Sequence, residues 1–215
     1  MKKKNLFYLF MGLLLAGGFQ SCSDDDDPKP VVNAVVKEVE IDATAYDKWI
    51  YFSFEKGMVV GNGSVEEKRA GTDWDIAFHR WDIRTNSGTS GSGKGGTLKA
   101  EGKTAKTGWD ALTVAPDAGY SVDENIAVMK KYGMPPTMVN VGGSSVITGG
   151  EKGDWVIFSH ANGPSYNVTN QIYLVKTATG KYVKVWLKQY TNAEKKGGHI
   201  TMKYAYQADG STKLN

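Results

Sequence analysis

The sequence predicts an all-β domain of many short antiparallel strands in a sandwich-like arrangement. Short segments with alternating apolar and polar side chains recur along the chain, and a period of two is typical of half-buried strands. Glycine-rich segments, which are typical of turns, separate them, and glycine supplies 26 of the 215 residues. The chain shows no internal repeat and nothing that marks a second domain. We therefore expect one β domain over residues 35–215.

Three strands are expected in the first half. Apolar and charged residues alternate from Val35 to Asp42. The dense aromatic run Trp49–Phe54 suits a strand that is buried on both faces. Alternation from Trp74 to Ile83 predicts one further strand. Its two expected faces are Trp74, Ile76 and Phe78 on one side and Ala77, His79, Trp81 and Ile83 on the other.

The second half contains more turn signals. Ser87–Thr97 is a glycine-rich loop, either flexible or packed by its glycines. Asp123–Lys131 fits a short helix with Asp123 near its cap, and it fits a strand nearly as well. Val141–Gly143 is expected to be a turn. The other expected strands are Ser145–Thr148, Asp154–His160, a hairpin of Gln171–Lys176 and Lys181–Tyr190 across Thr177–Gly180, and a last strand marked by Ile200, Met202, Tyr204 and Tyr206.

The N-terminus predicts export and lipid attachment. Lys2–Lys4 and the mostly apolar run Leu6–Gly18 form the basic and apolar regions of a signal peptide over residues 1–21. The segment that ends at Cys22 resembles a bacterial lipoprotein lipobox, which implies acylation of this thiol. Residues 22–34 form an acidic, proline-bearing tether, and Asp24–Asp27 resembles the signal for display on the outer face of the outer membrane in Bacteroidetes. The alternative is an ordinary signal peptide with a solvated linker.

Charge and cysteine content exclude several functions. Lys2–Lys4 leave with the signal, so the mature chain has 23 basic and 23 acidic residues. A neutral chain argues against nucleic-acid binding and against electrostatic attachment to a membrane, which leaves the lipid on Cys22 as the only membrane contact. Cys22 is the only cysteine. The folded part therefore has no disulfide, no cysteine-ligated metal and no cysteine nucleophile.

The motifs point to no enzyme. No Gly-x-Ser-x-Gly elbow occurs, and the glycines near Lys94 lack the spacing of a phosphate-binding loop. Of the three histidines, His199 is expected to be exposed on a strand and His79 to be a buried, hydrogen-bonded core residue. His160 stands where an apolar strand opens into a turn, which presents a side chain from a rigid support.

A second feature of interest is the segment around Pro135-Pro136. Met134 and Met138 flank this diproline in an expected loop. Thioether sulfur is a soft donor that binds iron or copper, and the diproline restricts the backbone on either side. Most methionines in loops simply pack, so these residues alone leave both readings open.

Several short motifs, in order and spacing, resemble the HmuY-like haem-binding lipoproteins of Bacteroidetes. The resemblance runs from about residue 36 to residue 206. Its motifs are Ile41-Asp42-Ala43, Trp49–Phe54, Trp74–Arg80, Arg84–Gly88, Gly93–Gly96, Ser145–Gly149 and Phe158-Ser159-His160.

The resemblance implies an all-β fold, attachment to the cell surface and haem capture for a TonB-dependent outer-membrane receptor, with host haemoproteins as possible donors. Two axial side chains hold the iron in this family. The second matches His160, and the place of the first is taken by Met134, with Met138 as the alternative. Tyr132, Val139 and Tyr166 are expected near the porphyrin because they lie close to these ligands in the sequence.

The rival hypothesis is a surface adhesin or glycan-binding module on the same fold. It is favoured by the departure from a pair of histidines, because Met134 stands where the family pattern has the first histidine. A related tetrapyrrole is also left open as the ligand. Under both hypotheses the protein is a binding protein and not an enzyme.

Overall fold

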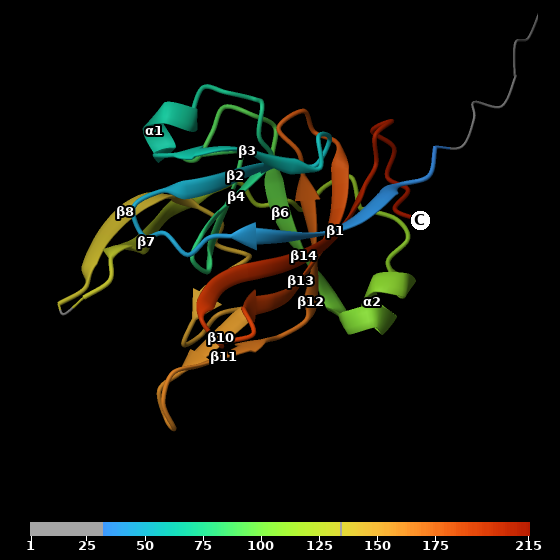
Figure 1. The fold of residues 1–215 in the computed structure, drawn as a ribbon. Helices are drawn as coiled ribbons and strands as arrows, with labels where there is room; N and C mark the ends of the chain where they lie inside the picture. The colour runs from blue at the N-terminus through green and yellow to red at the C-terminus, as the bar shows by residue number, and fades with distance from the viewer. Residues whose placement is uncertain (1–31, 134) are drawn as a thin grey trace, which may run out of the picture. The chain divides into compact units, whose positions relative to one another are not determined.

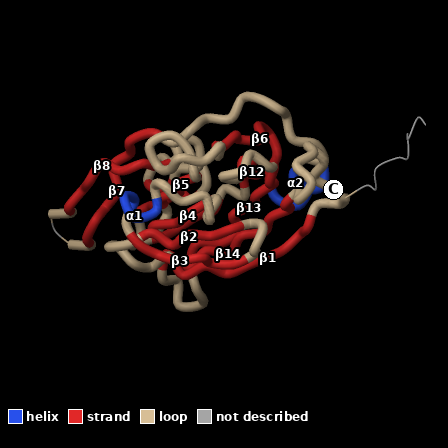
Figure 2. Tube along the Cα trace, turned by 90° about the horizontal axis from the view of Figure 1, so that it is seen from above, coloured by secondary structure: helices blue, strands red, loops and turns tan. Residues whose placement is uncertain are grey.

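The computed structural model describes residues 32–133 and 135–215, and the regular structure of this part is mainly strand (Figures 1 and 2). The strands are β1 (Val35–Asp42), β2 (Trp49–Ser53), β3 (Met58–Gly63), β4 (Ile76–His79), β5 (Asp82–Thr85), β6 (Gly96–Thr104), β7 (Glu124–Lys131), β8 (Thr137–Gly143), β9 (Gly149–Gly150), β10 (Val156–Ser159), β11 (Ser165–Val168), β12 (Gln171–Lys176), β13 (Tyr182–Thr191) and β14 (Gly197–Tyr206). The helices are α1 (Val65–Lys68) and α2 (Ala105–Ala111).

Two antiparallel sheets share the main core. One has five strands in the order β1-β14-β13-β12-β6, and the other has four in the order β3-β2-β4-β5. Alternate side chains of both sheets enter the same apolar cluster, which confirms the predicted all-β, sandwich-like class. Members of this cluster include Ile50, Phe52, Ile76 and Phe78 from the smaller sheet and Tyr173, Val175, Val183, Val185, Ile200 and Met202 from the larger one.

Two smaller strand groups flank these sheets. Strands β9, β10 and β11 form a three-stranded sheet, and β7 pairs with β8 as a separate hairpin. In both views this hairpin projects away from the sheets (Figures 1 and 2). The segment after Asp123 is therefore a strand, which decides between the two alternatives that its sequence allows.

The expected single strand Trp74–Ile83 is wrong. The chain turns back at Arg80 and Trp81, so that β4 and β5 form a tight hairpin in which His79 pairs with Asp82. Ile83 consequently lies opposite Phe78 and shares its cluster, whereas Trp74 packs with Ala77 in another cluster. Turn geometry overrides the alternation here, since Arg80 adopts a φ of 54° in a position that glycine usually fills.

Two further predictions, for neighbouring segments of the chain, are wrong. Ser145–Thr148 is a bend and no strand, because the Ser144 hydroxyl accepts hydrogen bonds from the backbone N–H groups of Val146 and Ile147. Val141–Gly143 is no turn, because it forms the end of β8. Its glycines serve close packing, since a Cβ on Gly142 would lie 2.6 Å from the Ser90 hydroxyl.

Other parts of the sequence analysis are confirmed. The hairpin of β12 and β13 and the last strand, β14, lie where they were expected. The glycine-rich loop is packed by its glycines, because a Cβ on Gly91 would lie 2.1 Å from Oδ1 of the buried Asn86. Strands β3, β6, β8, β9 and β11 and both helices were not predicted, because their sequence patterns are short or irregular.

Candidate functional site

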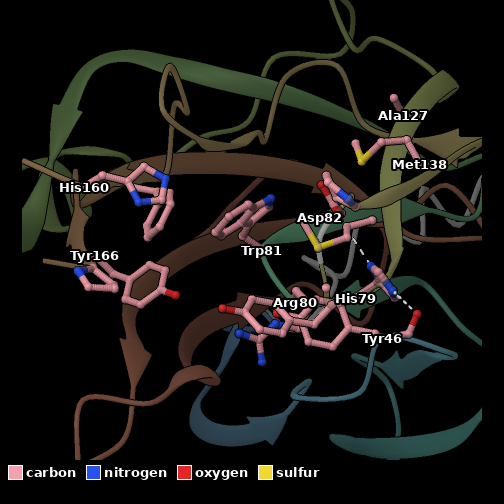
Figure 3. A pocket seen from close by; sticks show the side chains of 15 residues that line it. Tyr46, His79, Arg80, Trp81, Asp82, Ala127, Met138, His160 and Tyr166 are labelled. Atoms are coloured by element: carbon pink, nitrogen blue, oxygen red, sulfur yellow. Dashed lines mark hydrogen bonds and ion pairs between the residues drawn. The ribbon is translucent and has the colours of Figure 1, made fainter.

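A cavity of about 490 Å³ lies between four segments of the chain. They are the loop that carries Tyr46, the turn between β4 and β5, the β7–β8 hairpin, and strands β10 and β11 with their connecting loop. In Figure 3, His160 and Met138 lie on opposite sides of this space, with Trp81 between them. Most of the lining is apolar, and the size falls in the range of about 300–1,000 Å³ that is typical of ligand pockets.

One wall of the cavity is aromatic. The ring centroids of Trp81 and Phe158 lie 5.5 Å apart, and Phe158 stacks on Tyr166 at 5.1 Å. Trp81 is fixed from behind, because the indole N–H of the buried Trp155 donates to its carbonyl at 2.8 Å. A Cβ on Gly149 would lie only 2.5 Å from the Cβ of Trp81, so the absent side chain makes room for this indole. The wall is thus part of the packed core.

His160 directly follows β10, as the sequence analysis expected. Its ring meets that of Phe158 edge to face, with centroids 4.3 Å apart. The side chain is exposed and lines the cavity. Neither ring nitrogen forms a hydrogen bond with the residues that the structure describes, so a nitrogen lone pair is available to a ligand.

Two methionines of the β7–β8 hairpin face the same cavity. Met138 on β8 pairs across the strands with Met129 on β7, and both line the space. Met138 is 52% exposed, so its sulfur is accessible. Met134, the first predicted ligand, lies outside the described residues. Its neighbours Gly133 and Pro136 line the cavity.

His79 lies in the cavity wall as a buried residue. Its Nε2 donates to the carbonyl of Tyr46 at 2.9 Å, and its Nδ1 faces Oδ2 of Asp82 at 3.4 Å. Burial raises the pKa of the Asp82 carboxyl, and the hydrogen bond with His79 opposes this rise. With both ring nitrogens engaged and 3% exposure, His79 is the hydrogen-bonded core histidine that the sequence analysis expected.

Three other candidates occupy different places. Tyr132 and Tyr166 line the cavity together with His160 and Met138. Val139 belongs instead to a cluster that contains Trp49 and packs on the other side of β8. His199 is partly exposed on β14, where it pairs with Asp42 and lines a separate polar hollow.

Sequence reasoning missed several lining residues: Tyr46, Arg80, Trp81, Asp82, Met129 and Phe158. Trp81 and Phe158 belong to aromatic strand patterns, which predict burial and give no sign of a cavity. Tyr46 and Arg80 come from turns far from the diproline segment. Phe158 and Arg80 had a usable signal, since they stand in the motifs Phe158-Ser159-His160 and Trp74–Arg80 that carry the resemblance.

Comparison with known proteins agrees with this fold. No protein with a curated description matches the sequence. A structure from Bacteroides vulgatus, described as an HmuY-like haem-binding protein, is 24% identical with a TM-score of 0.58, and the match covers 79% of this chain and 90% of that one. The apo HmuY analogue of Tannerella forsythia is 22% identical with a TM-score of 0.59, covering 83% and 98%. A lipoprotein structure from Bacteroides fragilis is 21% identical with a TM-score of 0.57, covering 79% and 88%.

The family model named HmuY protein matches residues 45–204, which include all four segments around the cavity. This match spans most of the chain. The protein therefore belongs to the HmuY family.

Proposed function

We propose that this protein captures haem in the cavity, with His160 and a methionine of the β7–β8 hairpin as axial ligands. The observation that carries the proposal is the convergence of an imidazole, a thioether and an aromatic wall from distant parts of the sequence. The protein acts by binding and release and catalyses no reaction. The HmuY-like relative from Bacteroides vulgatus, which is described as haem-binding, supports the assignment.

The residues present fit haem iron. Imidazole nitrogen and thioether sulfur are both established axial donors to haem. The His160 ring has no hydrogen-bond partner among the described residues, and Met138 is half exposed. The stacked rings of Phe158 and Tyr166 offer an apolar surface to a porphyrin face.

The hairpin offers two candidates for the methionine ligand. The family resemblance favours Met134, and the cavity geometry supports Met138, whose side chain lines the space. We propose Met134 as the first ligand and Met138 as the alternative.

We further propose that Cys22 is acylated and that the protein stands on the outer face of the outer membrane. Residues 1–31 lie outside the described part, so this rests on the sequence and on the Bacteroides fragilis relative, which is described as a lipoprotein. In the described ranges, no helix has the length and apolarity needed to cross a bilayer. From that position the protein would take haem from host haemoproteins and pass it to a TonB-dependent receptor.

A haem titration tests the proposal. We expect stoichiometric saturation with a sharp Soret band, and tighter binding after reduction with dithionite, because a thioether matches ferrous iron better than ferric iron. His160→Ala should weaken binding, with His199→Ala as the matched control. A broad spectrum of free haem at all protein concentrations would contradict the proposal and leave the adhesin or glycan-binding alternative.

Two methionine variants identify the second ligand. Met134→Ala should weaken binding and shift the Soret maximum, whereas Met138→Ala should leave the Soret maximum in place. Met134→His should create a pair of histidines and move the preference toward ferric haem. The reverse pattern in the two alanine variants would assign the ligand to Met138. An unchanged spectrum in both would exclude a methionine ligand from these positions.

A further inference from the structure

Arg80 is held in an unusual place. It occupies the turn between β4 and β5 with a φ of 54°, a left-handed conformation that is unfavourable for a residue with a side chain. Its guanidinium Nη1 donates to the carbonyl of Gly197 at 2.8 Å and to that of Thr44 at 3.1 Å. The side chain lines the cavity. Strained backbone that presents a fixed charge to a cavity is typical of a binding site.

Among the described residues, this cation has no counter-ion. No carboxylate of that part of the chain forms an ion pair with Arg80, and its backbone hydrogen bonds use Nη1 alone. Among the described residues that line the cavity, Asp82 is the only carboxylate, and it faces His79. The guanidinium therefore has at least two donor positions left for a ligand.

Two tyrosines, Tyr46 and Tyr166, place their phenol rings beside the guanidinium of Arg80. Tyr46 lies under the guanidinium, whose central carbon is 4.7 Å from the ring centroid. Tyr166 approaches from the other side, since a Cβ on Gly197 would lie 3.1 Å from its Cζ. Figure 3 shows Tyr46, Arg80 and Tyr166 below Trp81 in the view. The Tyr46 hydroxyl interacts with the Arg80 guanidinium. The Tyr166 hydroxyl forms no hydrogen bond within the described part of the chain, and both residues line the cavity.

The tyrosine hydroxyls near Arg80 are available as hydrogen-bond donors. Burial raises the pKa of the Tyr46 phenol, so this group stays protonated at neutral pH and can donate. Behind Tyr166, the buried hydroxyl of Tyr190 has no hydrogen-bond partner among the described residues, and the two rings lie 4.9 Å apart. One end of the cavity thus holds a cation with free donor positions and two phenol hydroxyls, whereas most of the remaining lining is apolar.

We propose that Arg80, Tyr46 and Tyr166 form a carboxylate-binding subsite, which holds a propionate group of the haem and makes the cavity select free-acid porphyrins. This inference rests on the proposed function. A planar guanidinium with free N–H groups is suited to a carboxylate, and hydrogen bonds to a charged group are about twice as strong as neutral ones. An amphipathic ligand with apolar faces and an anionic edge matches both parts of the cavity.

The test compares haem with its dimethyl ester, which keeps the porphyrin faces and the iron but lacks both carboxylates. Binding is measured through the Soret band and through quenching of tryptophan fluorescence. We expect the wild type to bind haem at least about tenfold more tightly than the ester. Arg80→Gln and Tyr166→Phe should each reduce this preference by weakening haem binding alone. The exposed Arg69→Gln serves as the matched control for charge.

The possible results distinguish a failure of the carboxylate subsite from a failure of haem binding itself. Equal affinities for haem and ester in the wild type, with an axially ligated spectrum for both, would overturn the subsite and leave haem capture intact. Absence of binding to either porphyrin would overturn both. Arg80→Gln removes two bonds to backbone carbonyls, so its folding is checked by circular dichroism. If it fails to fold, the wild-type comparison and Tyr166→Phe, which removes only a hydroxyl, still decide the question.

Discussion

Asp123 connects the root of the β7–β8 hairpin to the sheet behind the cavity, and this connection should depend on pH. The carboxylate is 2% exposed. It accepts hydrogen bonds from the backbone N–H and the hydroxyl of Thr85, both at 2.8 Å, and from the hydroxyl of Ser90 at 2.5 Å. Burial nevertheless raises the pKa of Asp123 from 3.8 to about 6, since the hydrogen bonds and the nearby Arg84 only partly offset the loss of solvation.

The size and sign of the effect follow from this pKa. A rise of about two units corresponds to roughly 3 kcal/mol of free energy of unfolding. The folded state holds the proton more tightly than the unfolded state does. The contribution to stability is therefore fully present below about pH 4 and is lost as the pH rises through about 6.

Asp123→Asn isolates this contribution, because the amide stays neutral at every pH. The free energy of unfolding is measured by urea denaturation, with tryptophan fluorescence as the signal, at intervals from about pH 4 to pH 7.5. We expect the wild type to lose about 3 kcal/mol relative to the variant over this range. A difference that stays constant, or that changes in favour of the wild type as the pH rises, would refute the assignment of a desolvated carboxyl.

Three further predictions concern the anchor, the histidines and the cavity wall. Cys22→Ala should release the protein from the membrane or leave it unprocessed, as fractionation and protease accessibility would show, and a variant that stays anchored would contradict the lipoprotein assignment. His79→Ala and His199→Ala should leave the haem spectrum unchanged, and loss of haem binding in a folded variant would overturn the ligand assignment. His79→Ala should also lower the free energy of unfolding by about 1–3 kcal/mol, because the Tyr46 carbonyl and Asp82 lose their hydrogen-bond partner. Gly149→Ala should displace Trp81, since the new Cβ would lie 2.5 Å from that side chain, and should weaken haem binding in a titration, with unchanged affinity as the contrary result.

Strand patterns predicted the regular parts of the fold well. In the hairpin of β12 and β13, β12 is an apolar run, β13 mixes apolar and polar residues, and the turn contains a glycine, so local signals and tertiary structure agree. The β4–β5 hairpin has no such signal. Arg80 and Trp81 continue the alternation through the turn, and the left-handed conformation of Arg80 is compensated by contacts with Thr44 and Gly197 that are distant in sequence.

Glycines and serines between strands were harder to interpret. Gly142 and Gly143 look like turn residues, yet they allow β8 to pack closely against Ser90 and Ile126. The bend after Ser144 arises because its hydroxyl accepts two backbone hydrogen bonds. In each case the deciding contact is a close approach between side chain and backbone, which a period of two does not express.

The candidate site was predictable only where a motif carried it. The family resemblance predicted His160 with Met134, and Met138 as the alternative to Met134; the structure shows His160 and Met138 lining one cavity, and Met134 lies outside the described residues. Tyr46 and Arg80 share that cavity because a cation–π contact and two backbone carbonyls bring their turns together. Neither turn has a composition that distinguishes it from an ordinary surface loop.

The two sides of the cavity differ in how firmly the fold holds them. Trp81 is tied to the buried Trp155, and Phe158 and Tyr166 stack between paired strands. On the opposite side, Met138 projects from a two-stranded hairpin whose polar anchor, Asp123, lies at its root. Substitutions in the wall should therefore change stability and haem affinity together, because the wall is continuous with the main core. Substitutions at the exposed tip of the hairpin should change haem affinity alone. The axial ligand on the hairpin can therefore be replaced by another residue within this fold with little loss of stability.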